Sequence, residues 1–506
     1  MQLVAYGAQD VYLTANPQIT FWKVTYRRYT NFSMESIEQT FNGQADFGRR
    51  VQCTISRNGD LAYRTYLEVV LPEIKSTTSD LYARWLDYPG EQLINLVEVE
   101  IGGQRIDRQF GQWMHIWNQL TMTKEQEAGY NKMVGHTSQL TYLTDPSFAE
   151  VDGPCELDAP GQVCEPRNAL PETTLYVPLQ FWFCRNPGLA LPLIALQYHE
   201  VKINLELSPI ERCLWAVKAT PGSTITPASK HTDAYNKSLA NASLYVDYIF
   251  LDTDERRRMA QNPHEYLIEQ LQFTGEESVG SSSNKIKLNF NHPCKELIWT
   301  VQKDSLVQEC DNFEGSTLVC KAFGPQYFNY TDAVDALPNA LEAFTGVDRT
   351  DAKNPNEFVV NASGDFMDIS WTDAVNSYTA ASAYVVSETA LDMHCWGQNP
   401  VVMAKLQLNG QDRFSEREGS YFDLVQPYQH HTRHPDTGIN VYSFALRPEE
   451  HQPSGTCNFS RIDNATLHLT LSARTVKDDS AKVRVYAVNY NVLRIMSGMG
   501  GLAYSN

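Results

Sequence analysis

The feature that most constrains this chain is a phrase that its sequence contains twice. VEIGGQRIDR at 99–108 and LQLNGQDRFS at 406–415 both alternate apolar with polar residues around a Gly-Gly or Asn-Gly pair. Alternation is the period of a half-buried β-strand, and such pairs supply the positive φ of a tight hairpin turn. Each copy therefore predicts a β-hairpin, and the recurrence raises the question of a larger repeat.

The repeat continues along the chain. HEVKINLEL at 199–207 has the same pattern as DNATLHLTL at 463–471, and LYVDYIFLD at 244–252 has the same pattern as RVYAVNYNVL at 484–493. Three strand patterns thus recur in the same order, which a single chance match does not explain. The sequence predicts a tandem duplication.

The rest of the chain is also dominated by strand patterns. These lie at 51–56, 66–71, 175–183, 266–273, 285–290, 296–301 and 442–446. Helical patterns are minor and lie around 113–133 and 253–260. Short strands in two series, without β-α-β alternation, predict two all-β sandwiches or barrels. A length of 506 residues fits two domains of about 200 to 250 residues each.

Insertions interrupt the repeat unevenly. They lie near 150–173 and 208–243 in the first half, and one long insertion spans 303–393 in the second half. Loops longer than about 15 residues are usually functional or disordered. We expect these stretches to form an exposed, variable surface.

The charge of the chain argues against direct nucleic-acid binding. The formal net charge is −19, whereas a nucleic-acid-binding protein normally carries a basic face. The small basic clusters (Lys23 with Arg27 and Arg28; Arg49 with Arg50; Arg256–Arg258) are expected to be solvated or paired. The sequence contains no stretch of 18 or more apolar residues, so no membrane span is expected. The amino terminus lacks the features of a secretory signal, so synthesis in the cytosol is expected.

No catalytic motif occurs in the sequence with the spacing that its chemistry requires. HEYLI and HEVKI lack the second histidine of a zinc-protease helix, and neither a GxSxG elbow nor a phosphate-binding loop occurs. One alternative is a metal-dependent jelly-roll enzyme in which His430, His431 and His434, with Asp436, hold a metal ion. Because Pro435 and the flanking strand patterns favour a solvent loop there, we predict no catalytic residue, no metal and no cofactor.

Seven N-x-[ST] sequons occur, and four of them lie in the insertions. These candidate glycosylation sites are Asn236, Asn241, Asn329 and Asn361. Without a secretory signal we expect them to be unmodified unless an unusual modifying system acts. Two cysteine pairs in loop-like stretches, Cys155 with Cys164 and Cys310 with Cys320, could form late disulfides, although cytosolic thiols stay reduced. The glycine-rich carboxy terminus, SGMGGLAYSN, is expected to be an extended tail.

Several longer phrases resemble one known family. AYGAQDVYLTANPQITFWKVTYRRYTNF, VDYIFLDTDERRRMAQNPHEYLIEQLQFTG, PSGTCNFSRIDNATL and NYNVLRIMSGMGGLAY are similar to the major capsid proteins of large icosahedral nucleocytoplasmic DNA viruses, the algal-virus branch above all. The resemblance runs from about residue 3 to the end and breaks only at the insertions.

The resemblance implies a double jelly roll, with two eight-stranded sandwiches in tandem. It implies an amino-terminal arm at 1–26 on the inner side of the capsid, a first jelly roll at 27–254, a linker at 255–264 and a second jelly roll at 265–506. Three chains would form a homotrimeric capsomer with a pseudo-hexameric outline, because two similar rolls in each chain give six similar lobes.

The implied function is structural rather than enzymatic. The implied partners are the chain itself, neighbouring capsomers, minor capsid proteins and, indirectly, an inner membrane, with outer loops in contact with the host surface. The implied location is the virion, with assembly in the host cytoplasm. A carbohydrate-binding or receptor-binding module on the same sandwiches is a further alternative, motivated by Trp371, Tyr378 and Tyr384 in the long insertion.

Overall fold

The computed structural model describes most of the chain. The described residues are 7–75, 81–141, 170–218, 226–227, 234–307, 324–332, 359–360, 366–367, 397–476 and 480–504. Over these residues no helix has the length and apolar character needed to cross a bilayer.

The first half of the chain forms a sandwich of two antiparallel sheets. One sheet has the strand order β1-β12-β3-β7 and the other the order β2-β9-β5-β6. The strands are β1 (Phe32–Gln39), β2 (Arg50–Thr54), β3 (Leu61–Leu71), β5 (Ile94–Ile101), β6 (Gln104–Phe110), β7 (Thr173–Pro178), β9 (Val201–Leu207) and β12 (Asn241–Leu251). Most of them alternate buried with less buried residues, as β3 does, because one face of each sheet lies on the core.

The second half repeats this topology strand for strand. Its sheets have the orders β13-β23-β15-β20 and β14-β22-β18-β19. The strands are β13 (His264–Val279), β14 (Ser283–Leu288), β15 (Pro293–Lys303), β18 (Val401–Leu408), β19 (Gln411–Glu418), β20 (Asn440–Ser443), β22 (Ala465–Leu471) and β23 (Ala481–Met496). The predicted fold class, two tandem eight-stranded jelly rolls, is confirmed.

The two copies of the opening phrase occupy equivalent positions. The first forms the β5–β6 hairpin, in which Gly102 and Gly103 have φ of 57° and 85°. The second forms the β18–β19 hairpin, in which Asn409 and Gly410 have φ of 51° and 81°. Both turns therefore use the left-handed region that Gly and Asn tolerate best.

Short helices and short strands connect or extend the strands of the two sandwiches, except for η1 and α1, which lie in the amino-terminal stretch. The α-helices are α1 (Val11–Thr14), α2 (Pro89–Leu93), α3 (Gly111–Thr121), α4 (Lys124–Val134), α5 (Ser138–Thr141), α6 (Trp182–Arg185), α7 (Thr253–Gln261), α8 (Asp304–Val307), α11 (Gln426–His430) and α12 (Ala473–Val476). A π-helical turn, η6 (Tyr421–Val425), precedes α11, and the 3-10 turns are η1 (Ala8–Asp10), η2 (Pro187–Leu189), η3 (Ile210–Arg212) and η7 (Phe459–Arg461). The remaining strands are β4 (Leu81–Trp85), β8 (Leu191–Pro192), β10 (Leu214–Lys218), β11 (Thr226–Pro227), β16 (Val359–Val360), β17 (Phe366–Met367), β21 (Cys457–Asn458) and β24 (Met499–Leu502).

Two local expectations were wrong. The strand pattern at 175–183 ends as a strand at Pro178 and continues as the helical turn α6, whose aromatic side chains are buried. The glycine-rich carboxy terminus is not a free tail, because β24 pairs with β23. There Gly498 has a φ of 79° and closes the tight turn between the two strands.

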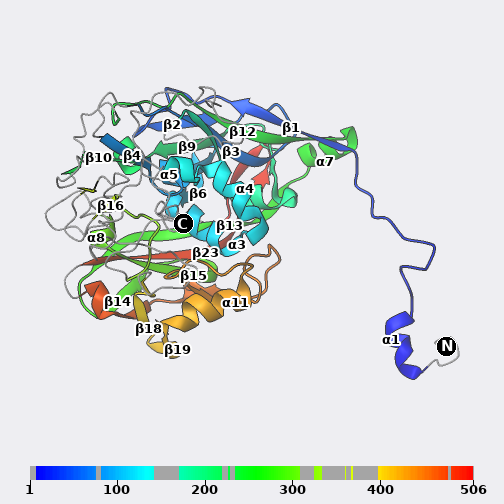
Figure 1. Cartoon of the computed structure of the whole chain (residues 1–506). Coiled ribbons are helices and arrows are strands. Elements are labelled where there is room, and N and C mark those ends of the chain that lie inside the picture. The colour runs from blue at the N-terminus through cyan, green and yellow to red at the C-terminus, as the bar shows by residue number, and fades with distance from the viewer. Residues whose placement is uncertain are drawn as a thin grey trace, which may run out of the picture.

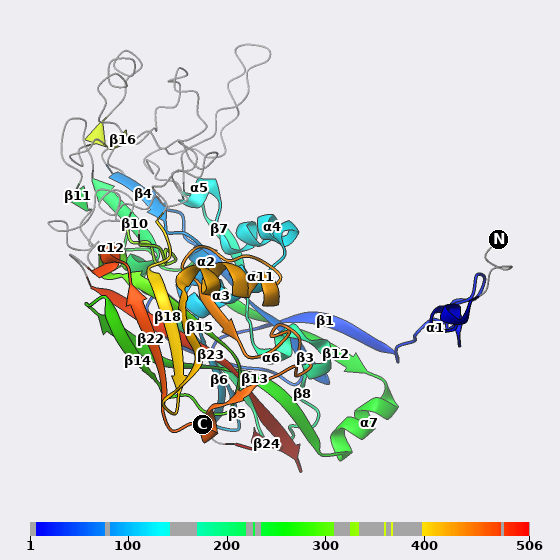
Figure 2. The same cartoon turned by 90° about the horizontal axis from the view of Figure 1, so that it is seen from below.

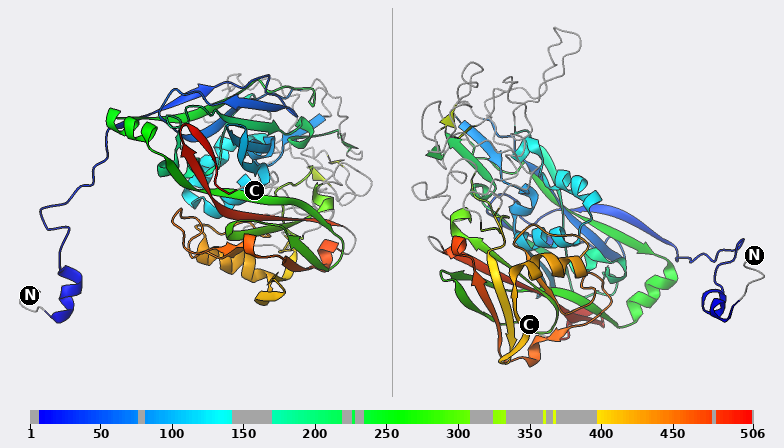
Figure 3. Two further views of the ribbon diagram at one scale, coloured as in Figure 1. Left: turned by 180° about the vertical axis from the view of Figure 1, so that it is seen from behind. Right: turned by 60° about the horizontal axis from the view of Figure 1, so that its bottom comes forward.

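The two sandwiches lie side by side and share part of their structure. In Figure 1 the first sandwich lies above the second. The long strands β13 and β23 cross between them, as the left view of Figure 3 shows. Ile268 of β13, with Leu493 and Ile495 of β23, joins the core of the first sandwich. Stability of the two halves is therefore coupled through these strands.

The amino-terminal stretch leaves the body of the molecule. Residues 7–31 contain only η1 and α1 as regular structure, and they extend away from both sandwiches in the views of Figures 1 and 2. Its large side chains are exposed, including Tyr12 at 92% and Phe21 at 100%. Such an extended apolar segment is typical of one that is covered by another molecule.

Candidate functional site at the contact between the two sandwiches

Helix α3 presents an apolar stripe to the second sandwich. Trp113, Ile116, Trp117 and Leu120 recur at the spacing of one helix face and are all buried there. Met114, on the opposite side, is buried in the core of its own sandwich. The helix begins at Gly111, where a Cβ would overlap the carbonyl oxygen of Ile94. α3 is thus held close to its own sheet while its stripe faces the other one.

The second sandwich offers the outward face of its β13-β23-β15-β20 sheet to this stripe. Ile298 of β15, Val441 of β20, and Tyr486 and Val488 of β23 form one cluster with the stripe. The rings of Trp113 and Tyr486 lie 5.4 Å apart, and Phe273 stacks on Tyr486 at 4.8 Å. This contact is apolar at its centre, like a domain core, and holds the two sandwiches together.

Polar groups at the edge of the contact fix the relative position of the two sandwiches. Arg433 of the second sandwich pairs with Glu127 of α4 at 2.5 Å, and its backbone N–H donates to the carbonyl of Leu120 at 3.1 Å. On another side, the backbone N–H of Leu271 donates to the Asp107 carboxylate at 3.1 Å. These bonds are directional, so they specify one relative position of the two sandwiches.

Glu269 of β13 joins the two halves through a buried ion-pair cluster. Its carboxylate accepts hydrogen bonds from Lys295 Nζ at 2.7 Å and from Arg185 of α6 at 3.2 Å, and His451 lies 3.8 Å away. The Lys295 side chain is fully buried. Burial alone would raise the pKa of Glu269, but the neighbouring His451, Lys295 and Arg185 outweigh it and lower the pKa to about 2. Glu269 is therefore an anion at every physiological pH.

His431 is held between two carboxylates. Its Nε2 donates to Glu296 at 2.8 Å and its Nδ1 donates to Glu449 at 2.9 Å, so both ring nitrogens carry protons. Burial alone would lower the pKa of His431, but the charge and hydrogen bonds of Glu296 and Glu449 raise it to about 9. The ring is an imidazolium near neutral pH, because its cost of burial is offset by two charged partners.

The stability that His431 contributes should depend on pH. Because its pKa is higher in the folded chain than the ordinary value near 6.5, the contribution is complete below about pH 6.5 and is lost as the pH rises through about 9. We expect the difference in unfolding free energy between the wild type and His431→Gln to fall by about 2–3 kcal/mol between pH 6 and pH 9.5. Chemical denaturation of both proteins at the two pH values measures this. An equal difference at both values would mean that folding does not raise the pKa of His431.

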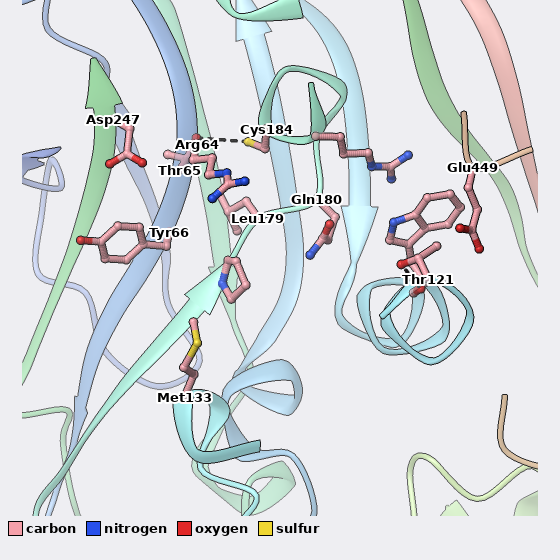
Figure 4. Close-up of a pocket in the computed structure, with 13 residues that line it drawn as sticks. Arg64, Thr65, Tyr66, Thr121, Met133, Leu179, Gln180, Cys184, Asp247 and Glu449 are labelled. Atoms are coloured by element: carbon pink, nitrogen blue, oxygen red, sulfur yellow. Dashed lines mark hydrogen bonds between the residues drawn. The ribbon is translucent and has the colours of Figure 1, made fainter. Parts of the chain in front are cut away.

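A cavity of about 570 Å³ adjoins the contact. It lies where β3, β7 and β12 of the first sandwich meet α3, α4, α6 and the segment that carries Glu449. In Figure 4, Arg64, Tyr66 and Asp247 stand on one side of it, and Thr121 and Glu449 stand on the other. The lining mixes rings and apolar side chains with guanidinium groups and carboxylates, so the cavity offers both apolar and charged contacts.

The three histidines of the alternative metal-site hypothesis take separate partners. His430 Nδ1 lies 3.1 Å from the carbonyl oxygen of Leu446, His431 binds its two glutamates, and His434 is exposed. Within the described ranges no group of three or more His, Cys, Asp or Glu side chains is arranged to hold a metal ion. The interpretation of 429–436 as a solvent loop was wrong for His431, whose side chain is buried by its ion pairs.

The candidate glycosylation sites differ in exposure. Asn236 and Asn241 are exposed. Asn329 is half-buried, and its amide donates to Gln326 at 2.7 Å while its oxygen accepts from Thr331. Asn361 lies outside the described residues, as do Cys155, Cys164, Cys310, Cys320, Trp371, Tyr378 and Tyr384, and most of the 303–393 insertion.

Sequence reasoning missed the residues that make this contact. The helix around 113–133 was predicted, but not that its stripe would bind the other sandwich. The signal was present as two tryptophans at 113 and 117 with apolar residues at 116 and 120. Glu269 and Lys295 gave no comparable signal, because an ion pair between distant strands leaves no local pattern.

Two family models together match almost the whole chain. Residues 20–252 match the model described as major capsid protein N-terminus. Residues 255–501 match the model described as large eukaryotic DNA virus major capsid protein.

Individual relatives give the same result. The chain is 73% identical to the major capsid protein of Phaeocystis pouchetii virus and 65% identical to that of Chrysochromulina ericina virus, with 100% of this chain and 99% of each relative covered. Among solved structures, a chain of the PBCV-1 virus capsid is 36% identical, with a TM-score of 0.64 over 96% of this chain and 100% of that one. The Faustovirus major capsid protein, at 14% identity and a TM-score of 0.63 over 97% of this chain and 94% of that one, has the same fold.

Proposed function

The chain belongs to the family of major capsid proteins of large eukaryotic DNA viruses, and from this membership we propose that three copies of it form a pseudo-hexameric capsomer that tiles an icosahedral shell. As a member of the family it is a structural protein of the virion that assembles with itself, and not an enzyme.

The observation that carries the trimer is the identity of the two strand orders. Both sandwiches have the same pairing in both sheets, and they pack side by side through α3. A closed ring of three such chains contains six similar lobes, and a sixfold outline is what a near-hexagonal lattice requires. Closed rotational symmetry is also the common form of homo-oligomers.

The proposed domain division places the boundary between the two rolls at α7. The arm at 1–26 precedes β1, the first roll at 27–254 ends just after β12, and the linker at 255–264 contains most of α7. The second roll at 265–506 holds the long insertion at 303–393. The exposed side chains of the arm support its place on the inner side of the shell, against minor capsid proteins.

The remaining partners follow from this arrangement. The inserted loops form the outer surface and contact the host surface, while an inner membrane is reached only indirectly through minor proteins. No direct contact with nucleic acid is proposed, since the net charge of −19 disfavours it. Assembly takes place in the host cytoplasm.

Native mass tests the proposal. Light scattering behind a sizing column should give a stable species at three times 57.3 kDa. An obligate trimer contact is expected to bury more than about 2,000 Å², so the species should persist on dilution into the nanomolar range. A monomer that persists at high concentration would contradict the capsomer.

A further inference from the structure

The repeat extends into the helix that follows each hairpin. Strand β6 leads into α3 at Gly111, and β19 leads into a helical segment at Gly419 that continues through η6 and α11. Gly419 lies against the carbonyl of Val401, the first residue of β18, as Gly111 lies against that of Ile94, the first residue of β5. In both places a Cβ would overlap this carbonyl. The two glycines are therefore equivalent, and they set the alignment of the two helices.

This alignment matches the stripe of α3 with a second stripe. Counting from the two glycines, Trp113, Ile116, Trp117 and Leu120 correspond to Tyr421, Leu424, Val425 and Tyr428. Tyr421 packs against the core of its own sandwich, so we call the other three residues, Leu424, Val425 and Tyr428, the α11 stripe. Met114 corresponds to Phe422, and each of these two side chains is buried in the core of its own sandwich. This inward position is thus the same in the two helices.

The two stripes differ in what covers them. The four residues of the α3 stripe are at most 4% exposed, because the second sandwich covers them. In the α11 stripe Leu424 is 49% exposed, Val425 39% and Tyr428 87%. The chain thus presents to solvent the apolar residues that pack against a sheet in the first copy. A cluster of exposed apolar residues of this kind marks an interaction surface.

The sheet that corresponds to the covering sheet, β1-β12-β3-β7, is only partly covered on its outward face. Tyr66 of β3 and Ile298 of β15 are each the sixth residue of an eleven-residue strand. Tyr66 pairs with Tyr245 and Pro178, as Ile298 pairs with Tyr486 and Val441.

On this face the rings of Tyr66 and Tyr245 stack at 5.2 Å, and Tyr176 meets Tyr66 at 6.1 Å. We call these three residues the tyrosine face. Its side chains are half-buried or exposed, whereas Ile298 and Tyr486 are fully buried. The cavity of Figure 4 lies beside this face and shares Tyr66 with it.

We propose that the α11 stripe of one chain packs on the tyrosine face of a second copy. The contact inside each chain, α3 on the β13-β23-β15-β20 sheet, then recurs between chains as η6 and α11 on the β1-β12-β3-β7 sheet. Because the stripe and the face are different surfaces, the contact is head-to-tail, and such contacts close into a ring when the rotation allows it. The inference rests on the proposed trimer and names its surfaces.

One pair of substitutions separates this proposal from a general loss of stability. Leu424→Asp places a carboxylate in the stripe, opposite a face that also carries Glu68 and Asp247. It should convert the trimer into a folded monomer, or raise the midpoint concentration of dissociation roughly 30-fold or more, as for loss of an interface anchor. Tyr198→Asp, at a residue 76% exposed in the loop before β9, is the matched control and should leave the trimer intact.

The outcomes distinguish the two proposals. If the wild type is not a trimer, the proposed function fails. If the wild type and Leu424→Asp are both trimers with the same dissociation midpoint, the trimer stands and these surfaces are wrong.

Cross-linking gives a second readout that does not depend on the folding of Leu424→Asp. Leu424 and Tyr245 correspond to Ile116 and Tyr486, which belong to one cluster within one chain. The double variant Leu424→Cys with Tyr245→Cys should give a much higher yield of covalent dimers and trimers with a short bismaleimide than either single variant, whose yields set the background of the native cysteines. Equal yields from the single and double variants would overturn the pairing.

Discussion

Trp113→Ala should lower the free energy of unfolding by about 3–5 kcal/mol, the usual cost of removing a large buried aromatic side chain. Trp113 is 1% exposed and touches both Trp117 of its own helix and Tyr486 of the other sandwich. Its loss leaves a cavity at the centre of the contact between the sandwiches, where neither sheet can move in to fill it.

Urea unfolding at one fixed protein concentration measures this loss, because the stability of an oligomer depends on concentration. Trp22→Ala is the matched control. Trp22 is 86% exposed in the amino-terminal arm, so its removal should change the unfolding free energy by less than about 0.5 kcal/mol. A cost below about 1 kcal/mol for Trp113→Ala would mean that the α3 contact contributes little to the fold.

The sequence predicted the sandwiches because their signals are local and occur twice. Alternation at 199–207 and 463–471 became β9 and β22, and the patterns at 244–252 and 484–493 became β12 and β23. Each pair occupies the same place in its sheet. Duplication made weak patterns specific, since a chance alternation does not recur in order at equivalent positions.

The same reasoning failed where burial is decided by distant partners. The segment around His431 has the composition of a loop, and only Glu296 and Glu449 from elsewhere in the chain make its burial favourable. The correspondence between the helices that begin at Gly111 and Gly419 was missed for a different reason. The residues that follow the two glycines share apolar character only at the stripe and core positions, so the match becomes visible only once burial is known.

Glu269→Gln should cost about 3–5 kcal/mol of unfolding free energy, because it leaves the fully buried Lys295 without its anion. Arg185 loses the same partner, so a contact between the two halves is lost as well. Since the pKa of Glu269 is about 2 in the folded chain, this contribution is present above about pH 4.5 and is lost as the pH falls through about 2.

The pair of Glu265 with Arg494 of β23 provides the matched control, since Glu265 lies on the same strand as Glu269. Both of its side chains are more than half exposed at a distance of 2.8 Å, so Glu265→Gln should cost less than about 1 kcal/mol. Combining Glu269→Leu with Lys295→Met removes both buried charges, and the double variant should be more stable than Lys295→Met alone. If the costs in unfolding free energy of the two single substitutions add up to the cost of the double variant, the two charges do not interact. The ion-pair cluster would then not help to fix the contact between the sandwiches.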